Sequence, residues 1–212
     1  MGDLEQWLPN AIQAGTAVGQ LWLGLTGRRQ QQAADWAATL AELANLDGPE
    51  LRRIVEDNPA VAELVGLAWE EAARTASDDK RYLLAQVAAA ALRGDSSPEK
   101  VDRLQFLLRP VIALDPPHIT LLVLAGTLPP STERIAQELV GQGHQLVRIE
   151  DLAHAWGSMK LLWPALAALD GQALTEIVAD HSPERYWVKL RPFGREFLDY
   201  LLVDAGGWPP QR

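Results

Sequence analysis

The amino-acid sequence predicts a mainly α-helical protein with one small β-hairpin near its carboxyl end. Alanine and leucine dominate residues 30–110, and runs of β-branched residues are scarce there, which favours helices over strands. Proline and capping residues recur in the same stretch at intervals typical of helix starts. The pattern changes near residues 174–190, where short β-branched and aromatic runs predict two strands.

Composition bounds the chemistry that the chain can perform. The 212 residues are 48% hydrophobic and 22% charged, as in an ordinary globular protein. The chain has no cysteine, which excludes disulfides, thiolate metal sites and cysteine nucleophiles. The net charge of −9 argues against a protein held mainly by contacts with phosphate groups. We expect a cytoplasmic protein that binds no cofactor and no metal.

Within the amino-terminal segment, residues 3–27, the longest apolar stretch runs from Ala11 to Gly27. Glutamine and threonine interrupt it, and it falls short of the ~20 apolar residues that a membrane-spanning helix needs. Glycines four residues apart permit close helix approach, so we expect a helix packed on the protein body or on a second copy. The alternative is a membrane-contacting segment. The candidate interface residues in this segment are Trp7, Gly15, Gly19 and Trp22.

Several helices are expected in the first half of the chain. The first covers residues 30–46. Gly48-Pro49 and Asn58-Pro59 open the next two, because proline suits the first helical position and asparagine accepts an otherwise free backbone N–H. A break near Ser77 and a start at Ser97-Pro98 delimit the helices that follow.

Pro116-Pro117 marks the expected domain boundary, because proline disfavours helical backbone in the residue before it. The expected domains are residues 1–116 and 117–205, followed by a tail of residues 206–212. In the second domain, helices are expected near residues 131–139, 151–156, 159–169 and 192–203, and strands at 174–179 and 186–190. Gly171 is the expected left-handed residue after the third of these segments.

Tryptophan is over-represented, with eight residues against three tyrosines. Trp36, Trp69 and Trp187 fall on apolar stripes and are expected in the core. Trp208 lies in the glycine- and proline-rich tail and is a further candidate interface residue, because exposed tryptophan favours interfaces.

A resemblance becomes visible at the carboxyl end of the chain. Leu166-Ala-Ala-Leu-Asp-Gly-Gln-Ala-Leu174, then the hairpin, then Leu190-Arg-Pro-Phe-Gly-Arg-Glu-Phe-Leu-Asp-Tyr-Leu201 resembles the end of winged-helix transcription regulators. In that family a leucine-rich recognition helix precedes a wing, and a proline-x-glycine-arginine motif opens the last helix. The resemblance implies a winged-helix-like domain over residues 117–205. The sequence departs from it at Arg191, where the family usually has a threonine cap.

The charge pattern of this domain argues against DNA reading, because helices that read bases usually carry Arg, Lys, Asn or Gln toward the major groove. The expected recognition helix, residues 160–170, has Lys160 as its only basic residue. The residues that remain available for phosphate contacts are Arg148, Lys160, Arg185, Lys189 and Arg195.

A second, weaker resemblance covers about residues 60–125. Within it, Leu64 to Leu92 places an acidic helix end at Asp78-Asp79 before a leucine- and alanine-rich helix. This arrangement is similar to the helical region of bacterial abortive-infection alpha-type proteins. The resemblance implies a role in phage defence without an assigned chemistry.

Catalytic signals are weak throughout the sequence. The four histidines (His118, His144, His154 and His181) form no metal-ligand spacing, and His118 is expected in the first turn of a helix. The acid pairs Glu70-Glu71 and Asp78-Asp79 flank helix ends, where acids commonly serve the helix dipole. We therefore expect a non-enzymatic protein-interaction or assembly module, self-associating or binding a protein partner. The alternatives are a DNA-binding regulator and a membrane-contacting effector acting through residues 3–27.

Overall fold

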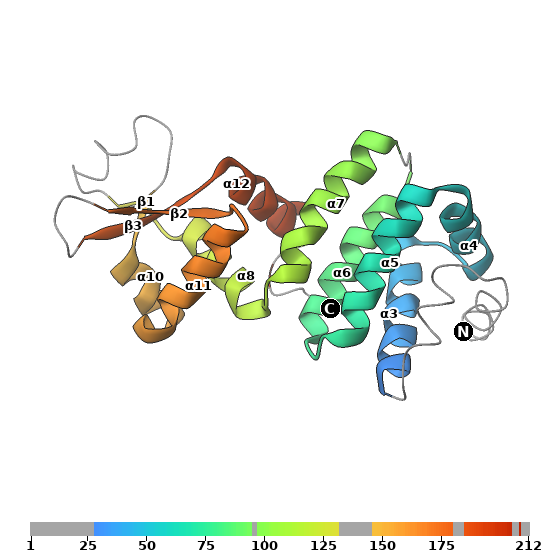
Figure 1. Ribbon diagram of the computed structural model, residues 1–212, viewed down its shortest axis with the longest axis horizontal. Helices are drawn as coiled ribbons and strands as arrows, with labels where there is room; N and C mark the ends of the chain where they lie inside the picture. The colour runs from blue at the N-terminus through green and yellow to red at the C-terminus, as the bar shows by residue number, and fades with distance from the viewer. Residues whose placement is uncertain (1–27, 95–96, 132–145, 180–184, 205–207, 209–212) are drawn as a thin grey trace. The chain divides into compact units, whose positions relative to one another are not determined.

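The computed structural model describes residues 28–94, 97–131, 146–179, 185–204 and 208 (Figure 1). The described part is mainly helical, and it contains a small three-stranded antiparallel sheet near the carboxyl end. This confirms the predicted fold class. By internal contacts the chain divides into two compact units, residues 1–112 and 113–212. The expectations for residues 3–27, for the helix at 131–139 beyond Ser131, and for His144 and His181 lie outside the described residues.

The first unit is built from consecutive helices. Within it α3 packs against α5 and α6, α5 also packs against α6, and α4 packs against α5. The bounds are α3 (Arg28–Ala44), α4 (Gly48–Asp57), α5 (Pro59–Arg74), α6 (Asp78–Leu92) and α7 (Pro98–Ala113).

Side-chain caps start these helices at the predicted positions. The Asp47 carboxylate accepts the Glu50 N–H at 2.8 Å, and the Glu50 carboxylate accepts the Asp47 N–H at 3.3 Å, which forms a capping box for α4. Asn58 Oδ1 accepts the Val61 N–H at 3.2 Å and starts α5, as predicted. Ser77 Oγ caps α6 in the same way at 3.2 Å from the Lys80 nitrogen.

The first helix ends earlier than the prediction of residue 46. Helix α3 ends at Ala44, and Asn45 adopts a left-handed conformation with φ 54°. Asparagine tolerates this region better than most residues other than glycine. The Leu46 N–H then donates to the Ala41 carbonyl at 3.1 Å and closes the helix end.

The predicted core tryptophans are buried, with Trp36, Trp69 and Trp187 at 3%, 2% and 1% exposure. Helix α6 is buried on most of its surface, and its Leu83, Leu84 and Val87 are fully enclosed. Full burial of each large apolar side chain contributes about 1.5–3 kcal/mol. The helical unit therefore covers its apolar faces thoroughly.

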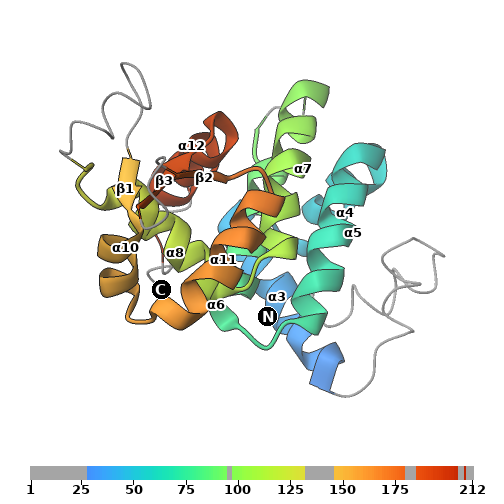
Figure 2. The ribbon, with the colours of Figure 1, turned by 60° about the vertical axis from the view of Figure 1, so that its left-hand side comes forward.

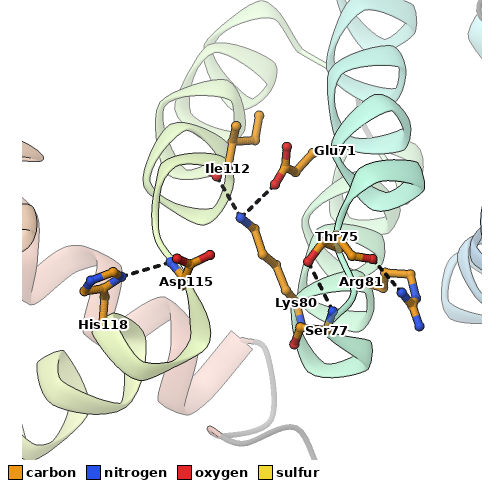
Figure 3. A network of polar contacts seen from close by, with 8 residues as sticks. All are labelled: Glu71, Thr75, Ser77, Lys80, Arg81, Ile112, Asp115 and His118. Carbon is orange, nitrogen blue, oxygen red and sulfur yellow. Dashed lines mark hydrogen bonds and ion pairs between the residues drawn. The ribbon is translucent and has the colours of Figure 1, made fainter. Parts of the chain in front are cut away.

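A buried lysine joins three helices of this unit, and no sequence signal had indicated it. Lys80 on α6 is only 3% exposed. Its Nζ lies 2.7 Å from Glu71 Oε1 on α5 and donates to the Ile112 carbonyl of α7 at 2.8 Å (Figure 3). Glu71, expected to serve a helix end, is thus the counter-ion of a buried ammonium. Two acceptors compensate much of the cost of taking the ammonium out of water.

The second unit combines helices with the sheet. The hairpin of β2 and β3 matches the prediction to within one residue, whereas β1 was not predicted. Helix α8 packs against α10, α11 and α12 (Figure 2). The bounds are α8 (Pro116–Thr127), β1 (Leu146–Arg148), α10 (Ile149–Trp156), α11 (Met159–Gly171), β2 (Thr175–Ala179), β3 (Tyr186–Leu190), α12 (Pro192–Asp199) and a π-helical turn η1 (Tyr200–Asp204).

The sheet has the strand order β1-β3-β2, with both pairs antiparallel. Residues paired across strands share a face, and successive residues alternate between faces. Trp187 therefore shares a face with Arg148 and Val178, its partners on the two neighbouring strands. Tyr186, the next residue along, belongs to the opposite face.

A tight junction joins α11, β2 and α12. The Arg191 guanidinium donates to the Thr175 carbonyl and to Asp170, both at 2.8 Å. Arg191 thus takes the cap position expected of threonine without capping the helix by its side chain, and it ties the end of α11 to the start of β2. A Cβ on Gly194 would lie 1.9 Å from the Leu174 carbonyl oxygen, which explains the glycine of the proline-x-glycine-arginine motif.

The prediction that Gly171 adopts the left-handed conformation after α11 is wrong. Gly171 is the last residue of the helix, and the left-handed position belongs to Ala173, with φ 57°. Here the Leu174 N–H donates to the Leu169 carbonyl at 3.0 Å. The turn into β2 thus holds Ala173 in the left-handed conformation, which alanine rarely adopts.

Candidate functional site

The described histidines occupy structural or solvent positions. His118 lies in the first turn of α8, as predicted, and its Nδ1 accepts the Asp115 N–H at 3.1 Å (Figure 3). This is a helix-capping contact. His154 is exposed in the last turn of α10. Within the described ranges, no group of three His, Asp or Glu side chains lies close enough to hold a metal ion.

The five basic residues considered for phosphate contacts are distributed over several elements. Arg148, at the end of β1, forms an ion pair with Glu150 at 3.3 Å, and Lys189 on β3 pairs with Glu176 at 3.0 Å. By strand register both lie on the sheet face that carries Trp187. Their charges are thus partly neutralised by neighbouring carboxylates.

The remaining three cations are exposed and form no ion pair with any described residue. Lys160 is the second residue of α11, and Arg185 directly precedes β3. Arg195 lies on α12, which packs against α8 and β3. Lys160 belongs to the surface described next, whereas Arg185 lies at the start of β3 and Arg195 belongs to another helix.

Helix α11 carries large apolar side chains on its solvent side. Met159 is 47% exposed, Leu161 61% and Trp163 40%. The opposite side of the helix is buried through Leu162 and Leu166. These three side chains therefore leave much of their surface open to solvent.

An aromatic pair connects this helix to the sheet. The rings of Trp163 and Tyr186 meet edge to face, with centroids 5.2 Å apart and planes at 88°. Edge-to-face pairs hold aromatic rings in a defined geometry. Met159, Lys160, Leu161, Trp163 and Tyr186 are called the α11 surface below.

Local backbone geometry positions the α11 surface. Gly157 adopts a left-handed conformation with φ 84° at the end of α10 and turns the chain into α11. Ser158 Oγ then accepts the Leu161 N–H at 3.4 Å. Met159, Lys160 and Leu161 consequently lie in the first turn of a helix with a side-chain cap.

Sequence reasoning missed Trp163 as a surface residue. Its signal was present, because Trp163 lies three residues after Lys160 and outside the buried stripe of Leu162, Leu166 and Leu169. The adjacent Pro164 lies inside the helix and is exposed as well.

The candidate interface residues outside α11 have separate positions. Trp7, Gly15, Gly19 and Trp22 lie outside the described residues. Trp208 is half-buried, and its Nε1 donates to Thr120 Oγ1 of α8 at 3.0 Å. Its indole therefore has an intramolecular partner.

Among the described residues, no single helix is both long and apolar enough to cross a membrane. No family model, no curated protein and no solved structure matches this chain.

Proposed function

We propose that residues 113–212 form a winged-helix domain that serves as a non-enzymatic protein-interaction module. The order of the elements in the described residues supports this proposal: a helix, a strand, two helices, a hairpin and a closing helix, with the first strand paired to the last. Such an order is shared by domains of many functions, so the side chains of the site decide between them.

The observation that carries the proposal is the set of large apolar side chains exposed in the first turns of α11. In winged-helix DNA readers, the equivalent helix enters the major groove and offers hydrogen-bonding side chains to base edges. Here the helix offers Met159, Leu161 and Trp163, and only one cation, Lys160. Clustered exposed apolar side chains that include tryptophan are typical of protein-binding surfaces.

The biological setting expected from the sequence stays a prediction. A role in phage defence or regulation rests on the resemblances at residues 60–125 and 166–201. The cytoplasmic location likewise stays a prediction.

Selection of displayed random peptides on the immobilised full-length protein tests the proposal. We expect binders that are retained by wild type and by the control variant Leu202→Ser but not by the double variant Leu161→Ser/Trp163→Ser. Leu202 is a suitable control because it is 38% exposed in the same unit but lies on η1. If the selected peptides bind all three proteins equally, or if the selection yields no binding peptide, the α11 surface is not a protein-binding site.

A gel shift with a short DNA duplex at low salt tests the regulator alternative. We expect no retardation, because the described cations of this unit are few and three of them, Arg148, Lys189 and Arg191, are paired with carboxylates. Tight, salt-sensitive retardation that needs Lys160 would contradict the proposal.

A further inference from the structure

We propose that the outer edge of β2 pairs with the β2 strand of a second copy of this chain, antiparallel and centred on Ile177. The pairing joins the two three-stranded sheets into one continuous sheet across a two-fold axis. It uses the backbone of β2 and does not depend on the α11 surface, so it goes beyond the proposed function.

Alternate residues of β2 direct their backbone groups away from the sheet. Among the described residues, β3 is the strand that pairs with β2, and it pairs on one side. The Arg191 N–H donates to the Leu174 carbonyl at 3.0 Å, so the backbone of Leu174 faces β3. Because backbone groups alternate along an antiparallel strand, the N–H and C=O groups of Thr175, Ile177 and Ala179 point to the outer edge.

The contacts of these outward groups support this assignment. The Arg191 guanidinium donates to the Thr175 carbonyl at 2.8 Å, and a carbonyl oxygen has a second lone pair for a further donor. At Ile177 and Ala179, the outward backbone groups form no hydrogen bond with another described residue. A row of alternating donors and acceptors of this kind is matched by another extended backbone.

The two outer strands of the sheet differ in how their edges are protected. Strand β1 has three residues and ends in the charged Arg148, and the Ser131 N–H donates to its Leu146 carbonyl at 2.6 Å. Short length, charge and a covering segment are common devices against edge pairing. Strand β2 has five residues without proline or lysine, and it pairs with β3 one to one without a bulge. Its edge therefore lacks the devices that protect β1.

Self-pairing satisfies the outward groups of β2. With the two-fold axis at Ile177, the Ile177 residues of the two copies exchange N–H to C=O hydrogen bonds. Thr175 of each copy then exchanges hydrogen bonds with Ala179 of the other. On the side-chain level, the pair of Ile177 with Val188 within one sheet continues into the same apolar pair of the second copy.

The charges of β2 permit this register. Glu176 is the charged residue of the strand, and it lies opposite the uncharged Val178 of the second copy. The carboxylate of Glu176 is already paired with Lys189 at 3.0 Å. The two Glu176 residues become diagonal neighbours at about 7–8 Å, so their repulsion is small. A second copy is thus an occupant that the residues of β2 themselves specify.

Sedimentation equilibrium of the full-length protein measures the Kd of the dimer. Two five-residue strands form a small interface, so we expect weak association. Ile177→Pro removes the outward N–H and no bond to β3, which proline permits in an edge strand. Ile177→Ala is the matched control, because it also loses the side chain but keeps the N–H. We expect the dimer Kd of Ile177→Pro to be at least about tenfold higher than that of Ile177→Ala, because each copy loses one hydrogen bond.

Introduced cysteines test the register, because the chain has no cysteine of its own. Glu176→Cys and Val178→Cys proteins are mixed and oxidised. Opposite residues in such a pair have Cα atoms about 4.5 Å apart, within the range that a disulfide bridges. We expect cross-linked dimers in the mixture in preference to either variant alone. This result does not require that Ile177→Pro folds.

Other results would overturn the inference. Wild type that stays monomeric up to about 1 mM has no such interface, and an equal dimer Kd for Ile177→Pro and Ile177→Ala shows that the edge is not used. Cross-linking of either cysteine variant alone as fast as the mixture rejects the register.

The remaining outcomes separate this inference from the proposed function. Dimerisation that is lost in Leu161→Ser/Trp163→Ser but kept in Ile177→Pro assigns self-association to the α11 surface, which overturns the inference and leaves the proposed function standing. A selected peptide that binds Ile177→Ala but not Ile177→Pro, with the protein monomeric, identifies a foreign segment as the occupant of the edge and also overturns it. Loss of the proposed function, by a peptide selection that yields no binder, leaves the measured dimer unaffected.

Discussion

The two units differ in how they treat apolar and charged side chains. The helical unit buries the faces of α5 and α6 and even encloses the ammonium of Lys80, which has two acceptors within 2.8 Å. Its exposed large apolar side chains in the described part, Leu67 and Phe106, lie on different helices. The second unit instead gathers Met159, Leu161 and Trp163 at one end of a single helix. Isolated exposed residues accompany ordinary packing, and we propose that the exposed residues gathered on α11 serve to bind a partner.

Among the substitutions that test this difference between the units, Lys80→Met is expected to lower the free energy of unfolding most. The substitution keeps the buried methylenes but leaves Glu71 and the Ile112 carbonyl without the ammonium. We expect a loss of about 2–4 kcal/mol in the free energy of unfolding, measured by urea denaturation. Arg52→Ala, which breaks the exposed pair with Glu56, is the control and is expected to cost at most about 1 kcal/mol. An equal loss in the free energy of unfolding for both variants would show that the contacts of Lys80 with Glu71 and Ile112 contribute no more to stability than an exposed ion pair.

Gly194→Ala is expected to have the next largest effect and to act on the second unit. The new Cβ would collide with the Leu174 carbonyl oxygen, which belongs to the backbone and cannot rotate away. The start of α12 must therefore shift, at a cost of about 1–3 kcal/mol. Thermal unfolding checks this value, with Gly171→Ala as the control because a Cβ there meets nothing within 4 Å. A stable Gly194→Ala would mean that the junction of α11, β2 and α12 yields easily.

Asn58→Ala is expected to cost about 1 kcal/mol, because α5 loses the side-chain acceptor for the Val61 N–H. Urea denaturation measures this loss, and Asn58→Asp, which restores an acceptor at the cap, is expected to recover most of it. Failure of the aspartate variant to recover stability would indicate that Asn58 contributes through packing and not through the cap.

Leu161→Ser is expected to have the smallest effect on stability and a large effect on binding. The side chain is 61% exposed, so its removal should change the free energy of unfolding by no more than about 0.5 kcal/mol. Measured beside Leu83→Ser, which alters a fully buried side chain, it separates the two kinds of apolar residue. A large destabilisation by Leu161→Ser would place this residue in the core and remove it from the proposed surface.

Local signals explain what sequence reasoning recovered of the fold. The starts at Gly48, Asn58 and Ser77 were predictable because a cap involves residues only three positions apart. The hairpin was predictable because its strands alternate in the sequence and are joined by a polar loop. These features depend on neighbours along the chain, which the sequence displays directly.

The features that sequence reasoning missed depend on distant partners. Lys80 donates to a carbonyl 32 residues away, and backbone carbonyls leave no mark in a sequence. Strand β1 has three residues and exists because β3 pairs with it. Sequence reasoning identified part of the α11 surface, because it named Lys160 as a candidate contact residue. It missed the contact of Trp163 with Tyr186, because only the tertiary structure brings these two residues together.

Mapping a bound peptide by NMR tests the central claim most directly. A peptide obtained from the selection is titrated into the isotope-labelled full-length protein, and backbone amide shifts are followed. The account predicts that the largest shifts cover residues 159–163 and 185–187 and that they disappear in Leu161→Ser/Trp163→Ser. Shifts confined to other helices, with residues 159–163 unchanged, would contradict it.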